Sequence, residues 1–383
     1  MANIMTRRRT TAPSTHALVI GVSDYPFADG PRASEFGESM GISNLSSAAR
    51  AASDVADWLL SEYANPDAPL GSLRVLLAPA RGEKLNKSIS ARVAGRRIAA
   101  TRAAVQADLK AFREACRANE DNVGIVYVAG HGIQLNKRGA VVLLTDFGDP
   151  RHLNELDGAI DVVGCHNAMD EAGTARTQIW FSDACRQLPD VARRFETLTG
   201  ALTLSEGNGR ADASPMFLAA STRESAFAEK GKSTLFARCL LDALRATALV
   251  GPDDGCPVWH VGSSQLGRVL PAAVRSAAAA HGEDQTVDIM GSANEVILQR
   301  FDRVPHVEIV VELDPGDVTP APDVTLQFGG NGKNLAKGKG WPLKYRGPAG
   351  LYLLDIDARP PLRAENKILD VMPPAHHTTV EVR

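Results

Sequence analysis

Two apolar stretches that each end in a reactive residue decide the fold, NVGIVYVAGHG (Asn122–Gly132) and TQIWFSDACR (Thr177–Arg186). Both are rich in β-branched and aromatic residues and become polar at their ends, which is typical of buried strands. Strands that are apolar on both faces belong to a parallel sheet that helices cover on both sides. The two stretches therefore predict an α/β architecture.

Further strands and helices alternate around these two stretches. Strands are predicted at His16–Val22, Leu73–Pro79, Ala140–Gly148 and Met216–Thr222. Helices are predicted at Asn44–Leu60, Thr101–Ala118, Asp161–Glu171, Ser233–Ala246 and Gln265–Ala280. The basic segment 81–97 has no regular period and is expected to be an exposed loop. Alternation of this kind predicts an α/β/α sandwich with a mostly parallel central sheet.

The composition changes after about Pro305, where Pro and Gly become dense and helical spacing disappears. Short extended segments separated by turn residues follow, which indicates a small all-β, sandwich-like domain. These segments are HVEIVVEL, DVTLQF, LYLLDID, NKILDV and HTTVEVR. The expected organisation is a flexible N-terminus at 1–15, a main domain at 16–301 and a β-rich accessory domain at 305–383.

Composition excludes several classes of protein. The 383 residues include 42 Lys and Arg against 45 Asp and Glu, a formal net charge of −3, with 44% hydrophobic residues. A nucleic-acid-coating protein or a disordered chain has a different balance. The five cysteines form no CxxC pair, so neither a disulfide framework nor a zinc site is expected. No apolar stretch is long enough to span a membrane, so we expect a soluble, cytoplasmic protein.

The ends of the two deciding strands carry the candidate chemistry. In a doubly wound sheet, active sites lie outside the carboxyl ends of the strands. One strand ends at His131 and the other at Cys185, and a lone thiol with a distant histidine is typical of a cysteine nucleophile and its base. The alternatives are a buried structural thiol and a histidine that only stabilises a turn.

Five segments together resemble a known family. They are HALVIGVSDY, NLSSAARAASDVADWL, VYVAGHG, IWFSDACR and FLAASTRESAFAEKGKSTLFARCLLDAL. In this order they are similar to the caspase-like cysteine peptidases of clan CD, peptidase family C14, especially the bacterial caspase homologues and metacaspases. The resemblance runs from about His16 to Phe301. It implies a caspase-like fold, a catalytic Cys185–His131 dyad without a third carboxylate, and an oxyanion hole formed by the backbone amides of Gly132 and Cys185.

The resemblance also implies a specificity. Animal caspases have Gln two places before the nucleophile, whereas this chain has Asp183, as metacaspases do. A second pocket carboxylate of metacaspases corresponds to Asp54. Two acids in one substrate-binding pocket attract Arg or Lys and repel Asp, so cleavage after Arg, with Lys second, is expected. The alternatives are a capping or ion-pairing role for Asp183 and a solvent-facing helical position for Asp54.

Maturation and activation are further expectations from the resemblance. Caspases are cut in the region that corresponds to 187–213, where Arg193, Arg194 and Arg210 are candidate autocleavage sites. An uncut surface loop is the alternative. No cofactor is expected to be required, although many metacaspases are activated by calcium, which Asp146 and Asp161 are candidates to bind. The alternative is that both carboxylates are simply solvated.

The resemblance places the protein as an intracellular endopeptidase, a regulated effector in stress, cell death or antiphage (antiviral) defence. Its partners would be a protein substrate with a basic residue before the cut and an upstream activator or regulatory protein. The alternatives are a catalytically silent scaffold that acts through its β domain and an acyltransferase or other hydrolase with the same dyad. A GKST sequence (Gly231–Thr234) imitates the end of a phosphate-binding loop, but the family resemblance explains it better.

Overall fold

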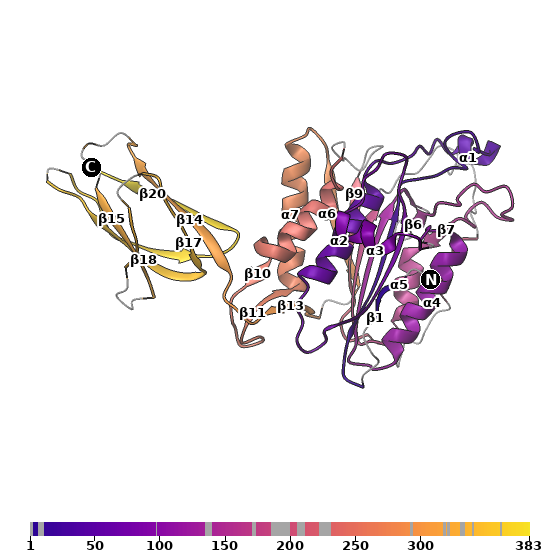
Figure 1. The fold of residues 1–383 in the computed structure, drawn as a ribbon, viewed down its shortest axis with the longest axis horizontal. Helices are drawn as coiled ribbons and strands as arrows, with labels where there is room; N and C mark the ends of the chain where they lie inside the picture. The colour runs from indigo at the N-terminus through magenta and orange to yellow at the C-terminus, as the bar shows by residue number, and fades with distance from the viewer. Residues whose placement is uncertain are drawn as a thin grey trace. The chain divides into compact units, whose positions relative to one another are not determined.

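The chain forms two compact units in a computed structural model (Figure 1). The structure describes residues 3–6, 11–96, 98–134, 140–170, 174–184, 200–204, 211–221, 231–291, 294–316, 319, 322–329, 334–338, 341–360 and 362–383. The first unit comprises Met1–Leu244 with Val261–Arg300, and the second comprises Arg245–His260 with Phe301–Arg383. Each unit has its own buried core.

A seven-stranded sheet with the order β1-β3-β2-β4-β8-β9-β12 forms the centre of the first unit. Five inner strands are parallel: β2 (Thr15–Val22), β3 (Leu70–Ala78), β4 (Val123–Gly130), β8 (Thr177–Ala184) and β9 (Pro215–Ser221). The two edge strands are antiparallel, β1 (Asn3–Thr6) and β12 (Gln285–Gly291). The prediction of a mostly parallel central sheet is therefore confirmed.

Strand β1 differs from the expectation of a flexible segment before His16. Asn3 pairs with Arg74 of β3, and Ile4 is buried. Pairing with β3 satisfies backbone groups that the edge of a sheet otherwise leaves exposed. Four residues contain too little periodicity to predict such a strand.

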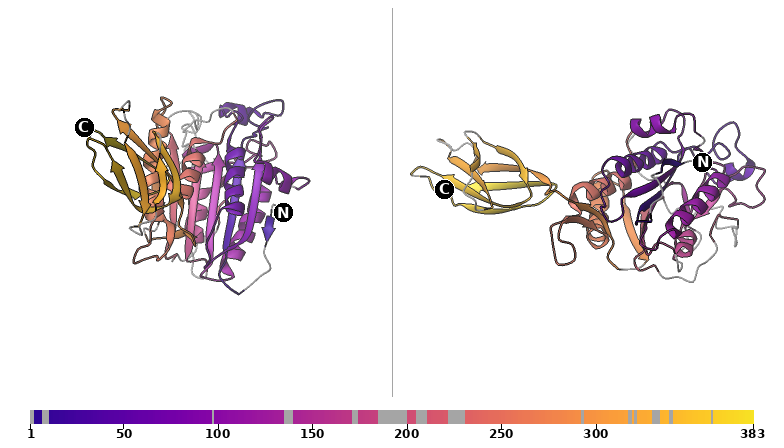
Figure 2. Two further views of the ribbon diagram at one scale, coloured as in Figure 1. Left: turned by 60° about the vertical axis from the view of Figure 1, so that its left-hand side comes forward. Right: turned by 60° about the horizontal axis from the view of Figure 1, so that its bottom comes forward.

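Helices cover both faces of the sheet (Figure 2). One face carries α2 (Ala48–Ser61), α6 (Leu235–Asp242) and α7 (Ser263–Ala279), and the other carries α4 (Arg102–Arg117) and α5 (Val162–Met169). Gly21 lets α2 approach closely, because a Cβ at this position would lie 2.5 Å from the Cβ of Ala52. On the opposite face, Leu18 shares a buried cluster with Leu109 of α4.

The remaining elements of this unit are short. They are α1 (Glu35–Ser39), α3 (Lys87–Val93), and a small sheet of β5 (Gly132–Gln134), β6 (Ala140–Leu143) and β7 (Ala159–Asp161). The expectation of an irregular exposed loop at 81–97 was wrong, because α3 lies within this segment. Asn86 caps α3, and the helix buries Ile89 and Val93. A π-helical segment (Ala243–Thr247) follows α6.

A third sheet contains β10 (Leu249–Val250), β11 (Trp259–Gly262) and β13 (Ile297–Phe301). None of the helices in the described ranges is long and apolar enough to cross a membrane.

The second unit contains two small sheets, which confirms the prediction of a β-rich C-terminal region. Their orders are β17-β14-β20 and β16-β15-β18-β19. The strands are β14 (His306–Asp314), β15 (Asp323–Phe328), β16 (Asn334–Gly338), β17 (Leu343–Pro348), β18 (Gly350–Asp357), β19 (Lys367–Val371) and β20 (Ala375–Glu381). Sequence patterns missed β16 and β17.

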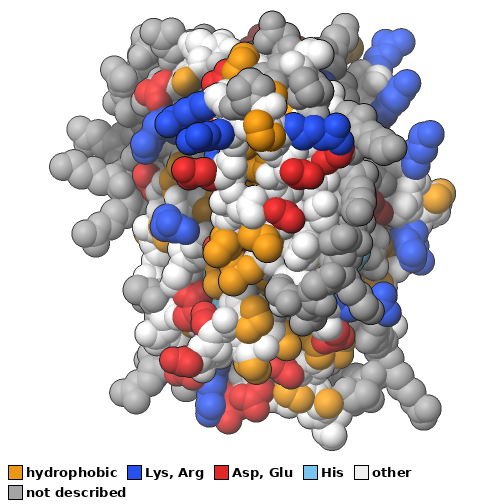
Figure 3. Space-filling model, turned by 90° about the vertical axis from the view of Figure 1, so that its left-hand side faces the viewer, with side chains coloured by type: hydrophobic (Ala, Val, Ile, Leu, Met, Phe, Trp, Pro, Cys, Tyr) orange, Lys and Arg blue, Asp and Glu red, His pale blue; other side chains and the backbone are white. Residues whose placement is uncertain are grey.

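Alternate side chains of the second unit point inward, as in a sheet with one buried face. Val307, Ile309 and Val311 of β14 are buried, whereas Glu308 is exposed. Ile368 of β19 remains 76% exposed. The face drawn in Figure 3 also carries a group of exposed hydrophobic side chains with carboxylates around it.

Candidate active site

His131 lies immediately after β4, between Gly130 and Gly132, and Tyr25 holds its backbone. The His131 N–H donates a hydrogen bond to the Tyr25 hydroxyl oxygen at 2.8 Å, and that hydroxyl donates to the Val22 carbonyl at 3.2 Å. Gly130 makes room for this contact, because a Cβ there would lie 2.8 Å from the Tyr25 hydroxyl oxygen. The glycine before the histidine is therefore required by close packing.

The ring of His131 is oriented by the main chain. Its Nε2 lies 2.7 Å from the Ser43 carbonyl oxygen. A carbonyl oxygen only accepts, so Nε2 carries the proton, and the neutral ring then has its lone pair on Nδ1. The side chain is buried, and this burial lowers the pKa of His131, although the hydrogen bond to Ser43 opposes the shift. The imidazole is therefore neutral at pH 7, as a general base requires.

Cys185 lies outside the described residues, whereas the strand that precedes it in the sequence is described. Strands β4 and β8 pair in parallel, and Gly130 and Ala184 are Cα partners at their carboxyl ends. His131 and Cys185 are the residues that follow these two partners. The predicted autocleavage residues Arg193, Arg194 and Arg210 also lie outside the described residues.

Asp183 is buried near the end of β8, where it is 2% exposed. Its Oδ2 accepts hydrogen bonds from the Tyr127 hydroxyl at 2.6 Å and from the Thr234 hydroxyl. Its Oδ1 is also buried but has no hydrogen-bond partner among the residues the structure describes. Burial raises the pKa of Asp183 to about 6, against the two hydrogen bonds. Such an oxygen is an acceptor available to a donor from outside the chain.

Asp54 lies on α2 and accepts from three side chains. Asn86 Nδ2 lies 3.1 Å from Oδ1, Arg50 Nε lies 3.1 Å from Oδ2, and the Ser233 hydroxyl also donates to Oδ2. Because Ser233 and Thr234 are consecutive, they bring Asp54 and Asp183 together at the start of α6. The pKa of Tyr127 is raised well above its usual value by burial first, then by Asp183, and to a smaller extent by Asp54.

Several residues of this site were not singled out from the sequence: Tyr25, Ser43, Tyr127, Ser233 and Thr234. The GKST motif was the available signal. Thr234 caps α6 by accepting from the Ala237 N–H at 3.2 Å. Two carboxylates beside this helix start repel phosphate, so the geometry opposes a phosphate-binding loop.

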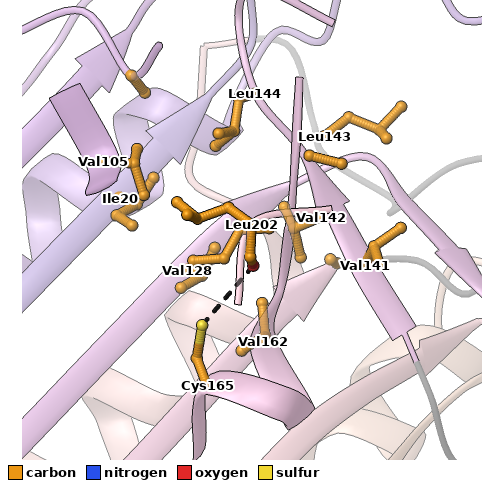
Figure 4. Close-up of a cluster of buried hydrophobic side chains, with 14 of the residues drawn as sticks. Ile20, Val105, Val128, Val141, Val142, Leu143, Leu144, Val162, Cys165 and Leu202 are labelled. Atoms are coloured by element: carbon orange, nitrogen blue, oxygen red, sulfur yellow. Dashed lines mark hydrogen bonds between the residues drawn. The ribbon is translucent and has the colours of Figure 1, made fainter. Parts of the chain in front are cut away.

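Three other cysteines are poor nucleophiles. Burial raises the pKa of Cys116, raises that of Cys165 to about 12 and raises that of Cys239 to about 11. Cys165 donates to the Leu202 carbonyl at 3.8 Å within a cluster of aliphatic side chains that includes Val128 (Figure 4). A thiol that remains protonated in an apolar core does not attack a substrate.

The two carboxylates considered for calcium have structural partners. Asp146 accepts from the Arg102 N–H at the start of α4 at 3.0 Å, and Asp161 accepts from the Gly164 N–H at the start of α5 at 2.7 Å. Over the described ranges, no group of three or more His, Cys, Asp or Glu residues is placed to hold a metal ion. Both carboxylates therefore accept hydrogen bonds at helix starts, and calcium binding by them stays a prediction.

Comparison with known proteins identifies the family. The family model for the caspase domain of peptidase family C14 matches residues 14–253. Among solved structures, caspase-1 from Spodoptera frugiperda is 13% identical over 78% of this chain and 97% of that chain, with a TM-score of 0.41. The structure of pro-sf-caspase-1 is 12% identical over 78% of this chain and 98% of that chain, with a TM-score of 0.40. No curated protein matches the sequence. The family model covers more than half of the chain, which therefore belongs to the caspase-domain family of cysteine peptidases.

Proposed function

We propose that the protein is a cysteine endopeptidase that cleaves protein substrates after Arg, with Lys second, through a Cys185–His131 dyad. The observation that carries this specificity is the buried Asp183 Oδ1, which has no donor among the described residues. A guanidinium or ammonium group of the substrate would supply that donor together with a compensating charge. Membership of the caspase-domain family supports the peptidase chemistry.

The dyad supplies the nucleophile and the proton transfers. His131 accepts the thiol proton at Nδ1, because its Nε2 proton is committed to Ser43. The thiolate sulfur forms a bond to the scissile carbonyl carbon, and the carbonyl electrons move to oxygen. The proposed donors to this oxyanion are the backbone amides of Gly132 and Cys185. The C–N bond then breaks as His131 returns the proton to the leaving amine, and water hydrolyses the remaining thioester.

The two pocket acids explain the preference for a basic residue. Asp183 offers a buried oxygen without a donor, and Asp54 lies near it through Ser233 and Thr234. An Asp side chain in the same place would meet like charges and leave its own carboxylate unpaired, which is costly in a buried setting. The pocket would therefore select against an acidic residue before the cut.

The proposed regulation of the enzyme rests on the family resemblance. The protein would act as a regulated intracellular effector in stress, cell death or antiphage defence. Arg193, Arg194 and Arg210 would be cut during maturation, and calcium activation stays a prediction. An upstream regulatory protein would control the enzyme, and the β-rich second unit would recognise a partner or substrate.

A panel of fluorogenic peptides that differ only in the residue before the cut tests the proposal. The wild-type chain should release the fluorophore after Arg, then after Lys, and not after Asp. Cys185→Ala should abolish release, whereas the matched Cys239→Ala should retain it, because the Cys239 thiol has a raised pKa. Cleavage after Asp, or activity that survives in Cys185→Ala, would contradict the mechanism.

A further inference from the structure

We propose that Arg50 determines the strength of the specificity pocket by neutralising Asp54, an inference that rests on the proposed cleavage after basic residues. Arg50 lies one helical turn before Asp54 on α2, a spacing at which side chains meet. Its Nε lies 3.1 Å from Asp54 Oδ2, and the two side chains are only 30% and 19% exposed. The chain therefore places a cation of its own beside one of the two acids that are proposed to receive a substrate cation.

The guanidinium of Arg50 is held on two sides. Its Nε donates to Asp54, and its Nη1 donates to the Lys84 carbonyl oxygen at 3.1 Å. The backbone N–H of Arg50 donates to Glu83 Oε1 at 2.8 Å. The segment before α3 thus fixes both the main chain and the side chain of Arg50. A side chain restrained in this way loses little further entropy when it pairs with Asp54.

The two pocket acids are consequently unequal. Asp54 already accepts from Asn86, Arg50 and Ser233, whereas Asp183 retains a buried oxygen without a donor in the described residues. Asp54, Asp183 and Arg50 taken together carry one net negative charge, whereas the two acids alone carry two. A substrate cation would bind Asp183 directly and would experience Asp54 only as a partly neutralised charge.

Loss of the Arg50 charge should therefore strengthen binding of basic groups. Arg50→Gln keeps a donor near Asp54 but removes a like charge from the vicinity of the substrate cation. We expect KM for an Arg peptide to fall about three- to tenfold with kcat nearly unchanged. Arg50→Lys should restore KM toward that of the wild type.

The experiment combines binding and kinetics on the full chain. Fluorescence titration with p-aminobenzamidine, a basic probe, reports pocket affinity without turnover, and the Arg fluorogenic peptide reports kcat and KM. The matched control is Arg268→Gln on α7, because Arg268 is exposed and donates to Gln265 within its own helix. Arg50→Gln should bind the probe about three- to tenfold more tightly, whereas the control should not change.

The outcomes separate this inference from the proposed function. If the wild type cleaves the Arg peptide but Arg50→Gln shows equal or weaker probe affinity, Arg50 does not act as proposed and the proposed function stands. A fall in kcat that Arg50→Lys does not restore would indicate a purely structural role and overturn the inference. If the wild type neither binds the probe nor cleaves Arg peptides, the specificity is wrong and the inference fails with it.

Discussion

The inner parallel strands have a histidine near buried charged groups at their carboxyl end and another at their amino end. The two ends differ in how these charged groups are paired. His131 follows β4 at the carboxyl end, whereas His16 lies at the amino end of β2. The amino end also borders a cavity of about 660 Å³, lined by His16, Ser72 and Arg74 among others. A cavity of about 920 Å³ in the second unit is larger still, so cavity size alone would not direct attention to the carboxyl end.

Arg74 at the amino end has its counter-charge within the chain, although its buried Nε has no hydrogen-bond partner among the described residues. Arg74 Nη1 lies 2.7 Å from Asp108 Oδ1, and His16 Nδ1 lies 2.8 Å from the Ser72 hydroxyl oxygen. Burial, and then the charge of Arg74, lower the pKa of His16 to about 4. At the carboxyl end, Asp183 has a buried oxygen without a donor in the described part of the chain. An unmatched carboxylate oxygen thus locates the candidate chemistry better than cavity volume does.

Exchanging the two histidines for alanine should give the largest contrast. His131→Ala removes the general base, so kcat/KM on the Arg peptide should fall about a hundred- to ten-thousandfold. His16→Ala, the matched variant at the amino end, should keep kcat/KM within about twofold because it removes only a packed neutral ring. Steady-state kinetics and thermal unfolding of both variants provide the measurement. Equal losses of activity would remove the functional distinction between the two ends.

Neutralising one acid at each end should separate specificity from stability. Asp183→Asn should lower kcat/KM for the Arg peptide by about 30-fold or more, since a buried charge partner of the substrate is lost. Asp108→Asn should instead destabilise the fold by on the order of 3 kcal/mol, because the buried Arg74 loses its counter-charge. Denaturant unfolding and the peptide panel distinguish the two effects. Unchanged selectivity in Asp183→Asn would be incompatible with the proposed pocket.

The pH dependence should be the subtlest contrast. The pKa of Asp183 is raised to about 6, so acidification through pH 6 neutralises this carboxylate. The value of kcat/KM for an Arg peptide should therefore decline there. It should decline more than kcat/KM for a matched peptide in which uncharged citrulline replaces Arg.

The stability of the fold should change with pH in opposite senses at the two ends. The lowered pKa of His16, about 4 instead of 6.5, means that stability is lost as the pH falls from 6.5 toward 4. The raised pKa of Asp183 means that stability is gained as the pH falls from 6 toward 4.

Thermal unfolding of the full chain between pH 4 and 7 checks the stability arm of this contrast. On acidification, His16→Asn should lose less stability than the wild type, and Asp183→Asn should lose more. Parallel curves for the wild type and both variants would show that neither group titrates as proposed. Parallel pH profiles for the Arg and citrulline peptides would likewise argue against a charged Asp183 in the pocket.

Apolar patterning was sufficient for the strands that position the candidate site. The runs that end at His131 and Cys185 are long, β-branched and followed by polar residues, and the structure has β4 and β8 there as parallel neighbours. Helix α2 was also predicted, but with its start at Asn44. The Asn44 side chain instead accepts from the Tyr25 N–H at 2.6 Å, and the helix begins after Ser47.

The partners of the site were not predictable, because they depend on contacts between distant segments. Ser43 contributes only its carbonyl oxygen, which every residue type possesses, so no side-chain pattern could reveal it. Ser233 and Thr234 were attributed to the start of a helix, and their bonds to Asp54 and Asp183 span 179 and 51 positions. Such contacts follow from the packing of α2 and α6 on one face of the sheet.

Because Ser233 and Thr234 are adjacent, the two acids of the proposed pocket depend on the same part of the chain. Thr234 caps α6 and Ser233 directly precedes it, so both acids are bound to one short segment at the start of a single helix. A displacement of the start of α6 would disturb both hydrogen bonds at once, and the pocket would be either complete or absent. A movement of the start of α6 would then remove the selectivity for a basic residue as a whole.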